Sequence, residues 1–157
     1  MWPLWVLVAM ISVTGYYSVS NQVRHHATPM AAESMTLASN MAIYRDAVLT
    51  YLHNNPGFSG TTIPTALLPL PTWGYTPKTI WAHYIAPDKT IVVYATVRPP
   101  VDITADLMNL SKNSILAGRA NTTTGRLESP VHGNTNIPLP AGITIPTGSP
   151  VWLAYRS

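Results

Sequence analysis

The stretch LASNMAIYRDAVLTYL, residues 37–52, carries the strongest structural signal in the chain. Its apolar side chains recur at alternating spacings of four and three residues, which places them on one stripe of an amphipathic helix. The run Asn54-Asn55-Pro56-Gly57 predicts an abrupt helix end. We expect a helix over about residues 31–54, with a packing face formed by Leu37, Met41, Tyr44, Val48, Tyr51 and Leu52.

The segment that precedes this helix is unusually apolar. Residues 1–23 contain no charged side chain, and Arg24 is the first. A helix that spans a bilayer needs about 20 such residues, with Trp and Tyr favoured at the two interfaces. We therefore interpret residues 1–23 as a transmembrane anchor whose membrane-facing residues include Trp2, Leu4, Trp5, Leu7, Ile11, Tyr16 and Tyr17.

Two other interpretations of residues 1–23 remain open. A cleaved secretory signal would normally bring a basic n-region and a small-residue cleavage site, and this segment shows neither. A buried core helix rarely stays uncharged over such a length. Pro29 predicts a kink or break near Thr28, between the anchor and the amphipathic helix.

The chain beyond Gly57 changes to proline-rich loops and short runs rich in β-branched and aromatic residues. The fold class that this order predicts is α+β, with a long N-terminal helix packed on a small, mostly antiparallel sheet. The globular domain would cover residues 24–157. We expect strands at 81–85 and 90–97 joined at Asp88-Lys89, a short helix at 102–114, a hairpin formed by 114–120 and 125–131, a turn-rich stretch at 138–148, and a last strand at 151–155.

Composition narrows the function. Charged residues make up 10% of the 157 residues, against about 25% in typical soluble domains, so part of the chain is expected to avoid bulk water. The nine basic residues are scattered, with no two adjacent, which argues against nucleic-acid binding. The absence of cysteine from the sequence excludes disulfides, thiolate zinc sites and a cysteine nucleophile.

No motif in the sequence points to catalysis, a cofactor or a metal. The sequence contains no glycine-rich phosphate loop, dinucleotide fingerprint, H-E-x-x-H or G-x-S-x-G. Asp102 and Asp106 stand four residues apart on a predicted helix, where first-turn carboxylates complement the helix dipole more often than they form a catalytic pair. We therefore predict a protein that is not an enzyme, without catalytic, cofactor-binding or metal-binding residues.

Trp73 and Trp81 are candidate partner contacts. They flank the turn Gly74-Tyr75-Thr76-Pro77, and tryptophan is favoured as an anchor at protein interfaces. The alternative is that both belong to the core of a small sheet, which large aromatic side chains commonly dominate.

Several short motifs, taken in their order and spacing, resemble one family. The chain is similar to the small inner-membrane PilM proteins of type IVb thin-pilus systems on conjugative plasmids, which are unrelated to the actin-like ATPase of the same name. After the apolar N-terminal segment, the matching pieces are Tyr44-Arg45-Asp46-Ala47-Val48 with Tyr51, Asn55-Pro56-Gly57, Leu70-Pro71-Thr72-Trp73, Trp81 and Tyr84 before Val93-Tyr94, Gly125-Arg126-Leu127, Pro138-Leu139-Pro140-Ala141 and Ile145-Pro146-Thr147-Gly148.

The resemblance implies a non-catalytic accessory or structural component of pilus biogenesis, in the basal body or as a pilin-like subunit. It implies a single-pass protein of the bacterial inner membrane with a pilin-like, periplasmic domain, although Arg24 alone would favour the opposite orientation. Its partners would be other pilus assembly proteins or pilins, with no nucleic acid and no small-molecule substrate. Because no Glu precedes Glu33, we do not expect prepilin-type processing or ordinary incorporation into the fibre.

Two alternative functions are compatible with the same membrane anchor. One is a membrane-tethered binding module, in the periplasm or on the cell surface, and exposure on the surface would favour it. The other is an anchored hydrolase, which would show a concave site with a perturbed histidine or carboxylate.

Overall fold

The computed structural model describes residues 29–156, so the segment interpreted as an anchor, residues 1–23, lies outside the described residues, as does Thr28. The chain divides into two units, Met1–Glu33 and Ser34–Ser157, and the fold below is that of the second unit. Within the described part the chain is helical over residues 29–54, and we call this segment the long helix.

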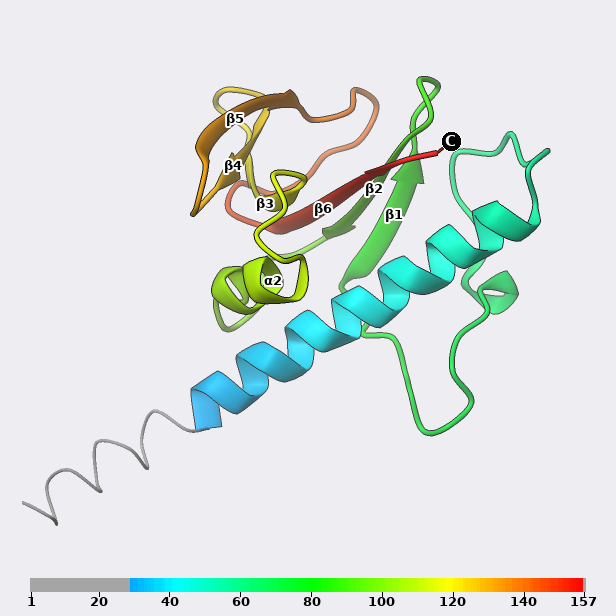
Figure 1. Cartoon of the computed structure of the whole chain (residues 1–157), viewed down its shortest axis with the longest axis horizontal. Helices are drawn as coiled ribbons and strands as arrows, with labels where there is room; N and C mark the ends of the chain where they lie inside the picture. The colour runs from blue at the N-terminus through cyan, green and yellow to red at the C-terminus, as the bar shows by residue number, and fades with distance from the viewer. Residues whose placement is uncertain (1–28, 157) are drawn as a thin grey trace, which may run out of the picture. The chain divides into compact units, whose positions relative to one another are not determined.

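Within residues 29–156, a single six-stranded sheet follows the long helix (Figure 1). Its strand order is β1-β2-β6-β3-β4-β5, and every neighbouring pair is antiparallel. The α+β class with one long helix and an antiparallel sheet is therefore confirmed. The elements are η1 (Thr65–Leu67), β1 (Trp81–Ile85), β2 (Thr90–Ala95), α2 (Thr104–Leu110), β3 (Ala117–Asn121), β4 (Arg126–Ser129), β5 (Gly133–Pro138) and β6 (Pro150–Tyr155).

The last strand of the chain lies in the interior of the sheet. β6 pairs with β2 on one side and with β3 on the other, so it joins the β1–β2 hairpin to the β3–β4–β5 meander. Its side chains alternate between two cores: Trp152 and Ala154 belong to one cluster, whereas Val151 and Leu153 belong to the other. The sequence of a strand that is buried on both faces is a continuous run of apolar residues, and residues 151–155 form such a run.

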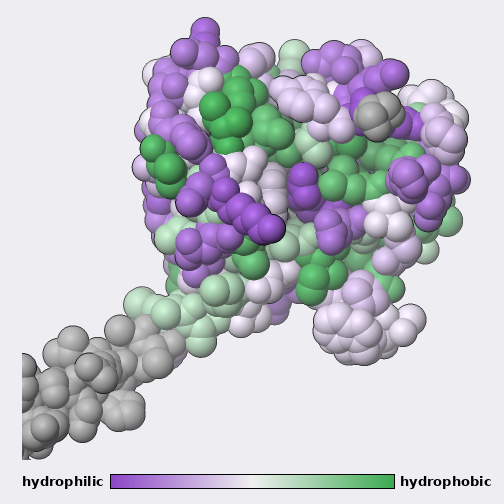
Figure 2. Space-filling model, viewed as in Figure 1, coloured by the Kyte–Doolittle hydropathy of each residue, from purple (hydrophilic) through white to green (hydrophobic). Residues whose placement is uncertain are grey.

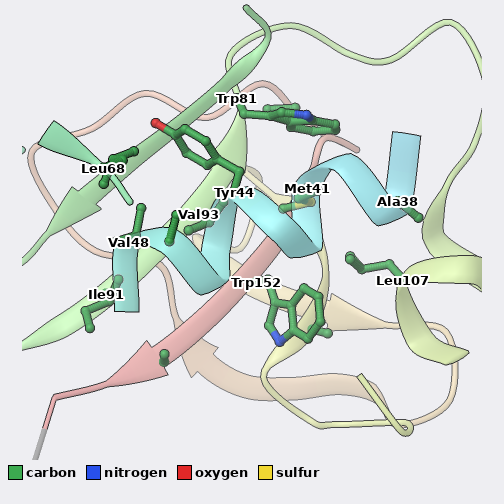
Figure 3. Packing of buried hydrophobic residues seen from close by; sticks show 14 of the residues in the cluster. Ala38, Met41, Tyr44, Val48, Leu68, Trp81, Ile91, Val93, Leu107 and Trp152 are labelled. Carbon is green, nitrogen blue, oxygen red and sulfur yellow. The ribbon is translucent and has the colours of Figure 1, made fainter. Parts of the chain in front are cut away.

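The larger core lies between the long helix and the sheet (Figure 3). Met41 and Val48 have no exposed surface, and Tyr44, Leu37 and Leu52 are also buried. Tyr51, the sixth residue of the predicted packing face, is half-buried at the margin of this core. The side chains that meet this face come mainly from β1, β2, β6 and α2, and they include Trp81, Ile91, Val93, Leu107 and Trp152.

The smaller core lies on the opposite face of the sheet. Val92 of β2 and Leu127 of β4 are buried there together with Ile145, which belongs to the segment between β5 and β6. Leu139 and Ile143 of the same segment pack against this cluster. The proline-rich stretch that the sequence marks as turns therefore covers one face of the sheet.

Two features of the secondary structure differ from the sequence prediction, the length of one helix and the presence of one strand. The helix predicted at residues 102–114 covers only Thr104–Leu110, because Lys112 and Asn113 adopt left-handed backbone angles, with φ of 54° and 56°, that end it. The strand β5 was not predicted. It is an edge strand whose side chains are mostly exposed, so it lacks the apolar alternation that marks a half-buried strand.

A substitution at Gly118 would test the close approach of β3 to β4. A Cβ atom at this position would stand 2.2 Å from the backbone carbonyl oxygen of Glu128. Since backbone atoms cannot move aside cheaply, Gly118→Ala should lower the free energy of unfolding by about 1–3 kcal/mol in urea denaturation. The matched control is Gly57→Ala, because nothing lies within 4 Å of its added Cβ. Equal stability of the two variants would contradict this strand pairing.

Candidate partner-contact site

The loop that precedes β1, residues 71–80, is hydrogen-bonded to Asn40 of the long helix. Asn40 Oδ1 accepts hydrogen bonds from the indole N–H of Trp81, at 2.8 Å, and from the backbone N–H of Lys78, at 3.0 Å. Its Nδ2 donates to the carbonyl oxygen of Thr76, at 3.0 Å. Two of these bonds hold residues 71–80, which we call the Trp73 loop, and the third holds Trp81 at the start of β1.

A fourth hydrogen bond to the same helix residue comes from a loop tyrosine. The Tyr75 hydroxyl donates to the backbone carbonyl oxygen of Asn40, at 2.9 Å. Burial raises the pKa of Tyr75 to about 12, and the neighbouring Tyr44 adds to the rise. The hydroxyl therefore stays protonated at neutral pH and continues to donate this bond.

The two tryptophans that the sequence offered as partner contacts lie in different environments. Trp73 is 74% exposed, at the tip of the anchored loop. Trp81 is only 6% exposed and belongs to the core between helix and sheet. Trp81 therefore follows the alternative that the sequence left open, a place in the core, because the inward face of β1 and the bond to Asn40 both direct its ring there. Trp73 alone keeps the exposure that a contact requires.

The surface around the long helix is mixed in polarity. Figure 2 shows apolar side chains in separate green areas with purple polar side chains between them. The large exposed apolar residues are likewise spread over several elements of the described chain, and they include Leu67, Trp73, Val97, Ile115, Val131 and Tyr155. Trp73 has the largest exposed fraction among them, which makes its loop the leading candidate for a contact surface.

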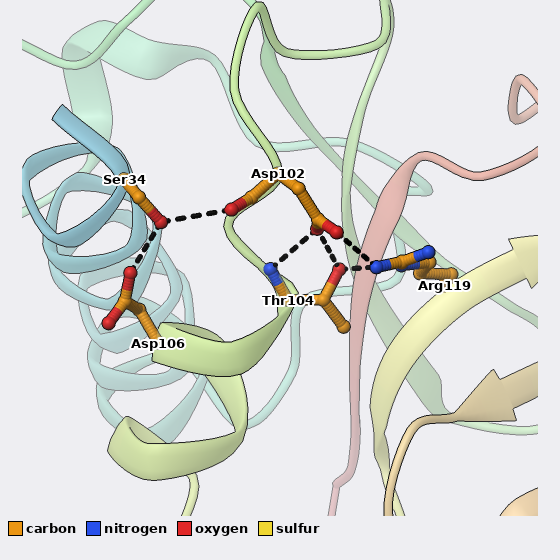
Figure 4. Close-up of polar contacts among 5 residues, drawn as sticks. All are labelled: Ser34, Asp102, Thr104, Asp106 and Arg119. Carbon is orange, nitrogen blue, oxygen red and sulfur yellow. Dashed lines mark hydrogen bonds and ion pairs between the residues drawn. The ribbon is translucent and has the colours of Figure 1, made fainter. Parts of the chain in front are cut away.

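A cluster of polar side chains joins the long helix, α2 and β3 (Figure 4). The Ser34 hydroxyl contacts Asp106 Oδ2 and lies 3.0 Å from the carbonyl oxygen of Asp102. Asp102 Oδ1 accepts hydrogen bonds from the backbone N–H and the hydroxyl of Thr104, at 3.0 and 2.6 Å. Arg119 Nε donates to the Thr104 hydroxyl, at 2.7 Å, and its Nη2 forms an ion pair with Asp102.

The geometry of this cluster is structural. Burial works to raise the pKa of Asp102, but the bonds from Thr104 and the charge of Arg119 outweigh it, so the pKa lies below its ordinary value. The carboxylate is therefore ionised, and its bonds to Thr104 and Arg119 hold the start of α2. Ser34 has a carboxylate and a carbonyl as neighbours in the cluster, and neither corresponds to the histidine that activates a serine nucleophile.

Asp102 and Asp106 were interpreted from sequence as helix-dipole partners. The structure gives them additional contacts, with Arg119 and Ser34 respectively. Sequence reasoning missed both, because Ser34 and Arg119 stand 72 and 17 residues away in the chain from their partners. The local spacing Asp-x-Thr, which favours a turn at a helix start, was the only available signal.

A buried histidine links β1 to the segment before η1. His83 Nε2 accepts a hydrogen bond from the backbone N–H of Ile63, at 2.8 Å. The neutral ring must then carry its proton on Nδ1, which donates to the Tyr44 hydroxyl, also at 2.8 Å. Burial lowers the pKa of His83 to about 4, so the ring is neutral at physiological pH and both bonds are satisfied.

The remaining sequence predictions concern the anchor and metal binding. All the anchor residues, from Trp2 to Tyr17, lie outside the described residues. In the part of the chain that the structure describes, no helix combines the length and the apolar character needed to cross a bilayer. Over the same residues, no three His, Cys, Asp or Glu side chains come together as a set of metal ligands.

Comparison with known proteins places the chain in a family. The PilM family model matches residues 8–153. The chain is similar to the crystal structure of a protein described as PilM from Escherichia coli B7A, with 26% identity, a TM-score of 0.55, and coverage of 79% of this chain and 93% of that one. A protein described as PilM from Pseudomonas aeruginosa 2192 is 30% identical, over 78% of this chain and 95% of that one, with a TM-score of 0.38. No curated protein matches the chain significantly.

The fold and the more similar of the two structures define a small α+β protein with one long helix and an antiparallel sheet. Because the family model covers most of the chain, the chain belongs to the PilM family. The resemblance seen in the short sequence motifs is thereby confirmed.

The pKa of His83 predicts acid sensitivity. An unfolded chain would bind a proton at this ring near pH 6.5, whereas the folded chain resists it down to about pH 4. The contribution of the neutral His83 ring to the free energy of unfolding is therefore fully present above pH 6.5. It is lost as the pH falls from there to about 4, by about 3 kcal/mol in total. Urea denaturation at pH values across this window would measure the loss.

The control for this prediction replaces the histidine itself. His83→Gln should be less stable at neutral pH, but its stability should fall much less between pH 6.5 and 4. His53→Gln, which changes an exposed histidine of the long helix, should keep the loss seen in the unaltered protein. A profile for the unaltered protein as flat as that of His83→Gln would contradict the assignment.

We expect the hydrogen bonds of Asn40 to keep the Trp73 loop rigid. Asn40→Ala leaves the N–H groups of Trp81 and Lys78 without their acceptor, so it should destabilise the fold by about 1–3 kcal/mol. It should also speed hydrogen exchange at Lys78, because this amide loses its partner. Ser39→Ala, one residue earlier on the same helix, is the control. Unchanged exchange in Asn40→Ala would show that other contacts hold the loop.

Proposed function

We propose that this chain is a non-catalytic accessory or structural component of type IVb pilus biogenesis at the bacterial inner membrane. Residues 1–23 would anchor it as a single-pass protein, and the domain would lie in the periplasm. Membership of the PilM family supports the pilus role. The apolar, uncharged character of residues 1–23 supports the anchor.

The observation that carries the proposal is the exposed Trp73 on an anchored loop. Exposing so large an aromatic surface to water is unfavourable, and tryptophan is enriched among the residues that dominate binding energy at interfaces. The loop is ordered beforehand by its bonds to Asn40. A partner that covers Trp73 therefore spends little free energy on fixing the loop.

The partners that fit this proposal are pilins or other pilus assembly proteins. The Trp73 ring would enter an apolar pocket of such a protein, with polar groups of the loop at the rim.

The test is a detergent-solubilised pull-down of the tagged chain from cells that carry its native locus, read by mass spectrometry. We expect the unaltered chain to recover pilus inner-membrane components, with its N-terminal residues 1–23 intact. Trp73→Ala should reduce that recovery by at least about tenfold, because it removes a central anchor. Leu67→Ala, which truncates another exposed apolar side chain, should recover the partners normally.

Two outcomes would contradict the proposal. If Trp73→Ala and Leu67→Ala recover the partners equally, the Trp73 loop is not the contact surface. If the unaltered chain recovers no pilus component and is found shortened and free in the periplasm, the pilus role is wrong. The chain would then be a soluble or formerly tethered binding module.

A further inference from the structure

A groove with a volume of about 890 Å³ opens at the C-terminal end of the long helix. Its walls come from the end of that helix, from residues 56–61, from the connection between β1 and β2, and from the end of β6. Figure 1 shows these segments gathered in the upper right of the view. The groove is separate from the Trp73 loop, since none of its lining residues belongs to residues 71–80.

The floor of the groove is apolar, and its mouth carries an exposed aromatic ring. Tyr155, at the end of β6, is 61% exposed although it stands beside buried residues of the sheet. The other large apolar side chains that line the groove are Leu49, Leu52, Phe58, Ile85 and Ile91. Such a surface can accept apolar side chains of a partner.

The charge of the groove is of one sign. Lys89 and Arg156 line it together with His53, and no Asp or Glu is among the lining residues. The nearest carboxylate in sequence, Asp88, accepts the backbone N–H of Thr90 at 2.9 Å and is held within its own turn. The groove therefore complements a ligand that is both apolar and negatively charged.

The walls of the groove are fixed by hydrogen bonds. Arg156 Nη1 donates to the carbonyl oxygen of Phe58, at 2.7 Å, and its Nη2 donates to that of Asn55, at 2.9 Å. On the other wall, the N–H of Ile85 donates to the carbonyl oxygen of Thr61, at 2.8 Å. Because Arg156 is occupied with these carbonyls, Lys89 is the cation placed to meet a ligand.

We propose that this groove binds a short segment of a protein partner that carries both acidic and apolar side chains. Apolar side chains of the segment fill the floor beside Tyr155, and its carboxylates meet Lys89. The inference rests on the proposed function, because it supplies a second contact through which a pilus protein is held. It concerns a protein segment and not a membrane surface.

The test uses the full-length chain in nanodiscs of zwitterionic lipid and two acetylated peptides. One peptide alternates aspartate with leucine, and the matched peptide alternates lysine with leucine. We expect the acidic peptide to bind, and Lys89→Glu to weaken it by about tenfold or more, since the substitution places like charges together. Tyr155→Ala should also weaken binding. Lys112→Glu is the matched control, because Lys112 is exposed, has left-handed angles like Lys89, and does not line the groove.

The contrary results are equally specific. No binding of the acidic peptide, or equal binding to Lys89→Glu and Lys112→Glu, would overturn the proposal. So would equal affinity for a peptide that alternates aspartate with serine, because the floor would then play no part. If short-chain phosphatidylglycerol binds in a Lys89-dependent manner and the peptide does not, the groove is a lipid site. The titration needs no pilus protein, so its failure is distinct from failure of the pull-down.

Discussion

The fold depends on the burial of one helix stripe against the sheet. Met41, Tyr44 and Val48 are almost fully removed from water, and burying a side chain of this size contributes about 1.5–3 kcal/mol. Without the helix, the sheet would expose this apolar face to water. Without the sheet, the helix would lack the tertiary packing that supplies most of its stability. Each layer therefore exists in its observed form because the other covers it.

β6 connects the long helix to the middle of the sheet through the side chain of Trp152. Trp152 on this strand faces the long helix, where the guanidinium of Arg45 lies 4.5 Å from the centre of its ring. Burial lowers the pKa of Arg45, and the charge of Asp46 works against that change. The aromatic face compensates part of the lost hydration of this cation. Arg45, which the helical spacing alone would leave in solvent, thus ties the helix to the middle of the sheet.

The sequence predicts the parts of this fold that follow a strong period. The stripe from Leu37 to Leu52 and the strand pair around Asp88-Lys89 could be derived because local spacing decides which side chains share a face. β5 could not, because an edge strand buries too little to leave a pattern. The end of α2 could not, because it depends on left-handed angles at Lys112 and Asn113. For the candidate site, the sequence identified both tryptophans but did not predict that Trp73 is exposed whereas Trp81 is buried. The bond from Trp81 to Asn40 joins residues 41 positions apart in the chain.

The long helix also sets the spacing of the two surfaces that we assign to partners. Asn40, which anchors the Trp73 loop, and His53, which lines the groove, stand on the same helix. At 1.5 Å of rise per residue, these positions are about 20 Å apart along the axis. A rigid element holds both, so neither surface has to be ordered when a partner binds. That distance exceeds the reach of a single side-chain contact. A partner therefore has to be large enough to extend along the helix, or two partners bind side by side. Either arrangement is compatible with the proposed role in pilus assembly.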